Sequence, residues 1–360
     1  MAFKHKLKGA LREGYARLLF HTGLCALVDK LMPPRLTILA GHCVRPAGGE
    51  WPAGEHLPPD MSISERKLDE FLRWFGARFE LVSVGAGVER LDRGLSGKSL
   101  VALSMDDGYR DNARVLTPLL ASHKASGTVY LESRPLDERK VNWAHKYFWI
   151  LARSTPEDFV HRFGELTSDK DAFHALNQHV CEGRVDLRYH LKLVLKYDAQ
   201  PAERDRVLDQ VFAELGGDER ALCDALYMDW DEARAMQRAG IELGGHTVNH
   251  PILAKLAPPE QSREIEDGAR SIERELGQRA RSFAYPWGRR WDFNEHSSRA
   301  ARESGFGCAV TMHAGVNTPK SERYTLKRLA IDDAAQLHLL AAEACGGFEL
   351  LRRLGVNLSE

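Results

Sequence analysis

The sequence is short of net charge, of long apolar runs and of paired cysteines, and each shortage excludes a class of protein. Its 50 Lys and Arg residues nearly balance 51 Asp and Glu residues, which leaves a net charge of -1. This balance removes a general electrostatic case for binding nucleic acid, and a neutral glycan fits it better than a polyanion. Because no 18-residue apolar span is present, the sequence predicts no membrane-spanning helix.

The six cysteines are scattered along the chain, and no two of them form a C-x-x-C pair. This spacing is typical of packed, reduced thiols rather than of an exported disulfide framework. It therefore indicates a cytoplasmic setting. The cysteines are Cys25, Cys43, Cys181, Cys223, Cys308 and Cys345.

The first 34 residues begin with basic side chains and continue with apolar ones, which raises the question of a signal peptide. Charged residues interrupt the apolar run, and no small-residue cleavage site follows it. The leucine spacing instead predicts an amphipathic helix that ends at Pro33 and Pro34. This helix is expected either to pack on the rest of the protein or to dock on a membrane surface, at its inner face.

Strand and helix patterns alternate along most of the chain, and this alternation predicts an α/β fold with a parallel sheet or barrel. Residues 132–226 interrupt this alternation, because they show charged helical patterns and no convincing strand. They predict a helical insertion over the barrel mouth, since they leave the C-terminal end of a strand. The expected division is an N-terminal helical extension, two barrel halves around the insertion, and a closing helix over 334–354. In residue numbers these parts are 1–35, 36–131, 132–226 and 227–360.

Two adjacent carboxylates close one of the predicted strands. The apolar run 100–105 ends in Asp106, Asp107 and Gly108. A turn at a strand end can swing both carboxylates toward one pocket, where one could hold a cation and the other handle protons. A solvated Asp-Gly turn is the alternative interpretation of this motif alone.

Two histidines four residues apart, His246 and His250, follow another strand pattern. Imidazole is the commonest neutral ligand for zinc-like metals, and two His with one Asp make an open three-ligand site. Pro251 disfavours helical geometry at His250, so a strand-to-loop segment is expected there. Surface histidines can show the same spacing, and the inference depends on the combination with the Asp pair. In the charged helix that follows, Glu264 is expected to be solvated.

A third segment places aromatic residues at a Pro/Gly turn after an apolar stretch. The three motifs, in this order, resemble the polysaccharide deacetylases of the NodB-homology type, carbohydrate esterase family 4. The resemblance covers residues 36–131 and 227–333, and it implies a distorted (β/α) barrel with a helical insertion. The motifs are Asp106-Asp107-Gly108, His246-Thr247-x-x-His250 and Phe283-Ala-Tyr-Pro-x-Gly288.

The resemblance implies a divalent metal, with Zn favoured, held by Asp107, His246 and His250. Such a metal polarises a carbonyl and lowers the pKa of bound water. Asp106 would then act as general base on that water. The third motif carries Ala284 where the family often has an arginine that orients the base, as in a subgroup with the Phe-Ala-Tyr-Pro pattern. Arg328 is expected to supply that charge, with a surface arginine as the alternative.

Four residues are candidates for contact with the substrate. Thr247 would help to shape an acetyl pocket, and a backbone N–H near Tyr285 would stabilise the oxyanion. Trp287 lies in the same turn as Tyr285. Trp143, in the insertion, either stacks on a sugar face or belongs to a helix core.

The proton donor to the leaving amine stays unassigned. The family's late Leu-x-Leu-His motif has an echo that ends at His338, but this residue falls in the predicted closing helix. His42, which follows the first strand, and His313 are the other candidates. A buried structural histidine is the alternative for His42.

The resulting hypothesis is a metal-dependent N-deacetylase that hydrolyses the acetamide of an N-acetylated amino sugar to a free amine and acetate. A cytoplasmic nucleotide- or lipid-linked glycan precursor of the cell envelope fits the missing secretion signal. Hydrolysis of a non-sugar amide on the same barrel is one alternative. A catalytically silent glycan-binding protein is another.

Overall fold

The computed structural model describes residues 2–94, 99–356 and 358. The chain divides into two compact units. The first comprises Met1–Gly49, Asp60–Ser133 and Met228–Glu360, and the second comprises Glu50–Pro59 and Arg134–Tyr227. No helix in the described ranges is both long and apolar enough to cross a bilayer.

A parallel sheet forms the centre of the first unit. Its strands follow the order β10-β1-β5-β6-β7-β8-β9, and β4 pairs with β5 beside this path. A separate parallel pair, β2 and β3, completes the strands. The bounds are β1 (Leu36–Gly41), β2 (Cys43–Arg45), β3 (Ser62–Ser64), β4 (Glu80–Val82), β5 (Leu100–Met105), β6 (Thr128–Leu131), β7 (Glu242–Gly245), β8 (Ser282–Ala284), β9 (Cys308–Val310) and β10 (Leu329–Ala330).

The two ends of the sheet path meet through one segment. Val310, the last residue of β9, bridges in parallel to Leu326, and β10 then pairs with β1. Strand β5 pairs with β1 along its whole length, whereas its other edge is shared between β4 and β6. The sheet therefore curves into a distorted (β/α) barrel, which confirms the predicted fold class.

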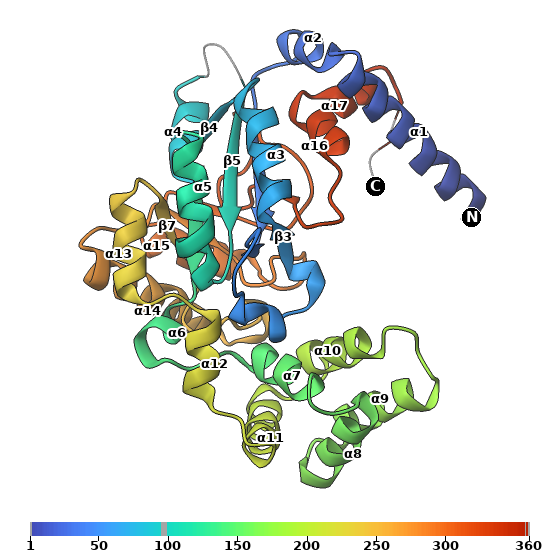
Figure 1. Cartoon of the computed structure of the whole chain (residues 1–360), viewed down its shortest axis with the longest axis vertical. Helices are drawn as coiled ribbons and strands as arrows, with labels where there is room; N and C mark the ends of the chain where they lie inside the picture. Colours follow the sequence, from blue (N-terminus) through green and yellow to red (C-terminus); the bar gives the residue numbers. More distant parts are fainter. Residues whose placement is uncertain (1, 95–98, 357, 359–360) are drawn as a thin grey trace. The chain divides into compact units, whose positions relative to one another are not determined.

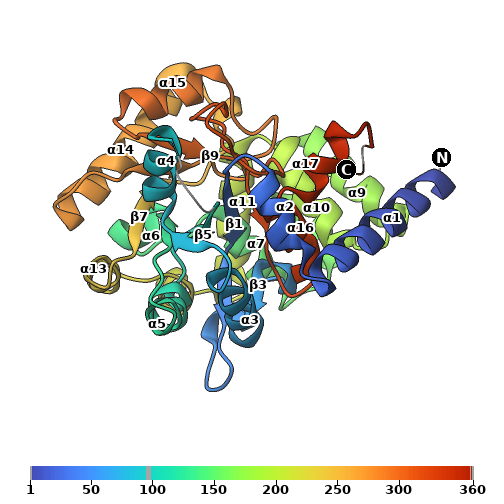
Figure 2. The same cartoon turned by 90° about the horizontal axis from the view of Figure 1, so that it is seen from above.

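Helices cover the outside of the sheet, so both faces of its central strands are buried and apolar. All six residues of β1 and of β5 are buried, as expected for strands in a covered parallel sheet. Figure 1 shows α3, α4 and α5 beside β5, and Figure 2 shows the same arrangement from above. The helices are α1 (Ala2–His21), α2 (Leu24–Leu31), α3 (Glu65–Gly76), α4 (Val84–Asp92), α5 (Thr117–Ser122), α13 (Trp230–Arg238), α14 (Pro258–Leu276), α15 (Glu295–Glu303), α16 (Leu337–Ala344) and α17 (Gly347–Arg353).

The single closing helix predicted over 334–354 is wrong. Helix α16 ends before Gly346, and α17 begins directly after it. Gly346 adopts φ 79°, a left-handed conformation that favours glycine. A Cβ at this position would lie 2.1 Å from the Arg35 guanidinium. The positive φ and the close approach of Arg35 together explain why glycine stands at this break.

The second unit is helical throughout its regular structure. Lys146 is buried and pairs with Asp209 at 2.5 Å and with Glu219 at 2.9 Å, which ties three of its helices together. Trp143 is also buried, and the Arg204 guanidinium lies 4.3 Å from the centre of its ring. The helices are α6 (Ser133–Glu138), α7 (Trp143–Leu151), α8 (Pro156–Leu166), α9 (Lys170–Cys181), α10 (Leu187–Tyr197), α11 (Pro201–Glu214) and α12 (Glu219–Leu226).

Candidate active site

The three motifs meet at one edge of the barrel. Asp106 and Asp107 follow β5, His246 follows β7, and Tyr285 follows β8. Because the strands are parallel, their carboxyl ends lie at the same edge, where parallel α/β folds place their sites. The sheet pairing thus brings together residues that are far apart in the sequence.

Unusual backbone conformations concentrate at this edge. Seven residues other than glycine in the described ranges have positive φ, and four of them belong to the motifs. Such conformations cost about 1–3 kcal/mol each, and they often mark functional sites. At Asp107 the left-handed turn explains how two adjacent carboxylates enter one pocket. The four residues are Asp107 (φ 73°), Thr247 (φ 66°), His250 (φ 54°) and Trp287 (φ 63°).

Asp107, His246 and His250 converge into one buried cluster. Each offers a ligand atom, and these atoms lie within 4.8 Å of one another. The His246 Nε2 and His250 Nε2 atoms lie 3.2 Å and 3.4 Å from the same oxygen, Asp107 Oδ1. Burial by itself raises the pKa of Asp107, but the facing imidazoles outweigh it and hold that pKa well below its usual range.

The hydrogen bonding of His246 shows that the cluster fits a cation. Its Nδ1 lies 2.7 Å from the Ala284 carbonyl, so Nδ1 carries the hydrogen and donates it. In the neutral ring, Nε2 then presents a lone pair to Asp107 Oδ1, a buried oxygen without a hydrogen bond. Two acceptors face each other, and a cation between them would remove the repulsion. Ligands at about 2.1 Å around a tetrahedral zinc are about 3.4 Å apart, close to the separations found here.

Arg328 holds Asp106 next to this cluster. Its Nη1 and Nη2 donate to the two carboxylate oxygens of Asp106 at 2.7 Å each, and its Nε donates to the Thr311 carbonyl at 2.9 Å. Both side chains are buried. Burial alone raises the pKa of Asp106, but the charge and hydrogen bonds of Arg328 outweigh it and lower that pKa. Asp106 is therefore kept ionised.

The loop that carries the histidines is held by two polar side chains. The Thr247 hydroxyl donates to the His246 carbonyl at 2.5 Å and accepts the His250 N–H at 3.1 Å. Glu264 of α14 accepts the N–H groups of Val248 and Asn249 at 3.1 Å and 2.9 Å. Glu264 is partly exposed, and besides the predicted contact with solvent it holds this loop. Its sequence position in a charged helix gave no signal of this contact with the loop.

Tyr285 supports the wall of the site from behind. Its N–H donates to the Val310 carbonyl at 3.2 Å, and its hydroxyl donates to the Tyr324 carbonyl at 2.9 Å. The N–H of Tyr285 itself is therefore engaged within the sheet, and the predicted oxyanion donor near Tyr285 would be another N–H. Trp287 lies nearer the cluster, because its ring centre is 5.0 Å from that of His250.

The remaining candidates lie in different places. His42 follows β1, where Asn112 Nδ2 donates to its carbonyl at 3.1 Å, and its charge is among the influences that lower the pKa of Asp106 and Asp107. His338 lies in α16 and pairs with Glu13 of α1 at 2.7 Å. His313 packs against Phe293, with ring centres 5.9 Å apart. Trp143 belongs to the second unit.

Sequence comparison links the chain to one family. Residues 192–309 match the family model described as Polysaccharide deacetylase. The protein YxkH of Bacillus subtilis (strain 168), which is named as a polysaccharide deacetylase, is 28% identical over 101 residues. That alignment covers 28% of this chain and 35% of YxkH, so it spans about a third of the relative's length.

Solved structures show the same fold at low sequence identity. The Streptococcus pyogenes deacetylase PplD, in complex with acetate, is 16% identical with a TM-score of 0.55, over 87% of this chain and 99% of PplD. IcaB from Ammonifex degensii is 17% identical with a TM-score of 0.52, over 87% of this chain and 97% of IcaB. Residues 192–309 are therefore similar to a polysaccharide deacetylase domain, and the solved structures share the fold of the chain.

Proposed function

We propose that this protein is a metal-dependent N-deacetylase that removes the acetyl group from an N-acetylated amino sugar. The proposal rests on one observation above all. A buried cluster of Asp107, His246 and His250 lies beside Asp106, which Arg328 keeps ionised. The Phe-Ala-Tyr-Pro subgroup fits this arrangement, because Arg328 takes the place of the arginine missing at Ala284.

The chemistry divides between these residues. Asp107, His246 and His250 would hold a divalent metal, with zinc favoured, which when bound polarises the acetamide carbonyl and acidifies water. Asp106 is the general base that takes a proton from the attacking water. Arg328 acts through Asp106, because it fixes both carboxylate oxygens and the ionised state.

The other residues orient the substrate and complete the proton transfer. Trp287 forms a wall against which a sugar ring can pack. Thr247 holds His250 and so positions the site around the acetyl group. We assign the proton delivered to the leaving amine to His42, which follows β1 at the same edge of the barrel as the aspartates that follow β5. Trp143, buried against Arg204 in the second unit, fits the helix-core alternative better than a sugar contact.

The substrate class follows from the family and from the composition of the chain. A near-zero net charge suits a neutral N-acetylated glycan or glycan precursor. We propose a nucleotide- or lipid-linked precursor used in the cytoplasm for cell-envelope glycan synthesis. The named relatives support a deacetylase of glycans in general, and they do not specify the carrier.

Acetate release tests the proposed function. The purified protein, loaded with zinc, is offered nucleotide-linked N-acetyl sugars, lipid-linked ones and short N-acetylated oligosaccharides. Release by the wild type and not by Asp106→Asn would support the reaction and narrow the substrate. If metal is bound but no sugar releases acetate, the proposal is wrong. A panel of non-sugar amides and a glycan-binding assay then separate the two alternatives.

A further inference from the structure

The exposed apolar side chains of this protein gather at its two chain ends. Of eleven large hydrophobic residues that are exposed in the described ranges, seven lie in α1, in α2 or just after α17. These helices form one cluster in the first unit, in which α1 packs on α2 and α16, and α17 packs on α2 and α16. Figures 1 and 2 both show them together. The seven residues are Leu11, Leu18, Leu24, Leu27, Leu31, Leu354 and Val356.

Helix α2 shows the arrangement most clearly. Leu24, Leu27 and Leu31 are 38%, 53% and 67% exposed, and their spacing places them on one side of the helix. Cys25 and Val28 are buried and lie on the adjoining side of the helix. The helix therefore has enough apolar residues to pack on the barrel and still presents a second apolar side to its surroundings.

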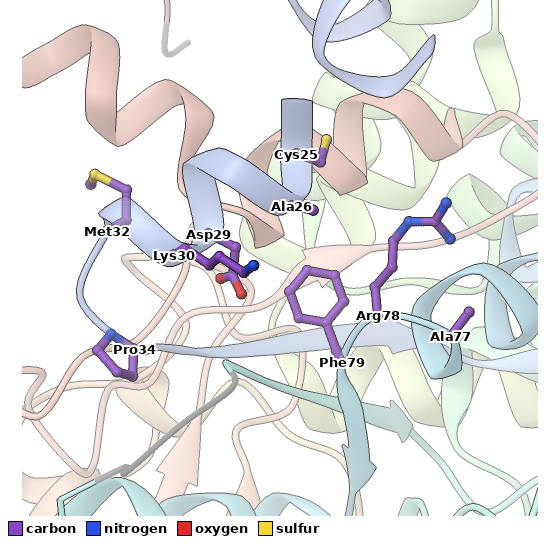
Figure 3. Close-up of a pocket in the computed structure, with 9 residues that line it drawn as sticks. All are labelled: Cys25, Ala26, Asp29, Lys30, Met32, Pro34, Ala77, Arg78 and Phe79. Atoms are coloured by element: carbon purple, nitrogen blue, oxygen red, sulfur yellow. The ribbon is translucent and has the colours of Figure 1, made fainter. Parts of the chain in front are cut away.

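A cavity continues this surface on the other flank of α2. It has a volume of about 570 Å³ and lies between α2 and the start of β4, where Met32 and Phe79 line it (Figure 3). Lys30, Arg78 and Asp29 also line it, and Asp29 lies 3.8 Å from the Arg35 guanidinium. At about 100° per residue, Lys30 lies between the exposed leucines and the cavity on the helix surface. The exposed side of α2 thus has leucines on one flank, a partly apolar cavity on the other, and Lys30 between them.

The same region is basic, although the whole chain is not. Residues 1–35 contain seven Lys or Arg residues and two acidic residues, against a net charge of -1 for all 360 residues. Of these seven, Arg35 is buried, and Arg12 and Arg17 pair with Glu343 and Glu13. Arg352 and Arg353 of α17 add two more basic residues beside one acidic residue, Glu349. Exposed leucines in a basic setting match the composition of helices that lie in the interface of an anionic bilayer.

We propose that the surface formed by α1, α2 and α17 docks on a lipid bilayer that contains anionic lipids. Leucines enter the boundary between headgroups and acyl chains, and Lys30 meets lipid phosphates. A second copy of this chain fits the surface less well, because a two-fold contact would place the same basic patch on both sides. The proposal goes beyond the deacetylation reaction and does not depend on it.

Vesicle co-sedimentation tests the proposal with the full-length protein. Wild-type protein should sediment with phosphatidylcholine vesicles that contain phosphatidylglycerol, bind far less to phosphatidylcholine alone, and dissociate as salt is raised. The Leu24→Gln, Leu27→Gln and Leu31→Gln triple variant should lower vesicle partitioning by about tenfold or more. Lys30→Glu should lower it by at least about fivefold, and only for the anionic vesicles.

A matched control changes exposed apolar residues elsewhere. Val185 and Leu215 belong to the second unit and are 83% and 42% exposed. Val185→Gln with Leu215→Gln should leave vesicle binding unchanged, and circular dichroism checks that every variant is folded. Failure of the wild type to sediment, or equal binding by the leucine triple variant, would overturn the proposal. The proposal would also be overturned if the wild type formed a dimer that did not bind vesicles and that the leucine substitutions dissociated.

Discussion

Arg328 and Asp106 form a two-pronged ion pair in the interior of the barrel, with both N···O distances at 2.7 Å. The segment that links the ends of the sheet supplies Arg328, and the carboxyl end of β5 supplies Asp106. The same ion pair therefore helps to close the barrel and keeps the proposed base ionised. Loss of either partner should affect both stability and catalysis.

Replacing Arg328 should change the pH dependence of the reaction. Asp106 has a lowered pKa because of Arg328, so the base is ionised well below neutral pH. Arg328→Met should raise the pKa of Asp106 and move the acid limb of the rate profile to higher pH. Rate measurements on both proteins over the same pH range check this, and an unshifted limb would contradict the assignment.

The stability of the same pair gives a separate test. Removing one partner of a buried ion pair costs about 3–5 kcal/mol, because the other charge stays buried. Arg328→Met should therefore lower the free energy of unfolding more than the double variant Asp106→Asn with Arg328→Met. Because the folded pKa of Asp106 is lowered, its contribution is present above its unfolded pKa and lost as pH falls through the folded value. Denaturant titrations of the three proteins measure both effects.

The metal content of variants should show that Asp107 and Asp106 have different roles. Asp107→Ala and His250→Ala should lose bound metal and activity together. Asp106→Asn should keep the metal and lose turnover by about 10²–10⁴-fold, the usual contribution of a general base. Elemental analysis and acetate release on the same preparations decide the question. An Asp106→Asn protein with a near-normal rate would show that the base is wrongly assigned.

The stability that the histidine cluster contributes should fall as pH rises in the metal-free protein, whereas the stabilisation by bound zinc should grow. Burial lowers the pKa of His246, but Asp107 and Asp106 outweigh burial and raise it above 6.5. The stability that this imidazolium contributes is complete below its unfolded pKa of about 6.5 and is lost as pH rises through the higher folded value. Zinc binds the neutral ring, so zinc-dependent stabilisation should grow with pH. Thermal unfolding at pH 6 and pH 8, with chelator or zinc, measures both, and His246→Gln is the control.

Glu264 should support metal binding without touching the metal. Its carboxylate accepts two N–H groups of the histidine loop, so Glu264→Ala should weaken zinc affinity by about 10–100-fold, as outer partners of a metal site do. Glu266→Ala is the matched control, because Glu266 of the same helix pairs with exposed Arg270 instead. Competition with a zinc indicator gives both affinities. Equal affinities would show that the loop holds its shape unaided.

Variants of Thr247 can show whether this residue positions His250 or contacts the acetyl group of the substrate. Thr247→Val keeps the shape but removes the acceptor of the His250 N–H, so zinc affinity should fall and Thr247→Ser should restore it. If Thr247 instead only contacts the acetyl group, Thr247→Val would raise KM and leave zinc affinity unchanged. Zinc titration and steady-state kinetics on both variants separate these outcomes.

Local sequence signals predicted the ends of the strands and the residues that follow them. Asp106 and His246 stand at such ends, so parallel pairing was enough to bring them together. Long-range contacts decided what the sequence could not show. Glu264 looks like any solvated helix residue until it meets the loop of Val248 and Asn249, and the Tyr285 N–H is engaged only because β9 lies beside it. At the helix break, Arg35, more than 300 positions away, lies so close to Gly346 that a Cβ would clash with it.

The length of β1 fixes the distance between helix α2 and the mouth of the barrel. Helix α2 leads directly into β1, whose opposite end opens at His42, and six residues at about 3.3 Å each span about 20 Å. A bilayer that held α2 would therefore lie at the floor of the barrel, with the mouth that holds Asp106 and Asp107 turned to the solution. Among the proposed lipid-linked precursors, one whose sugar is attached directly to the headgroup would be too short to reach this mouth. Glycans that extend several units from their carrier, or carriers that diffuse freely, would be selected by length alone.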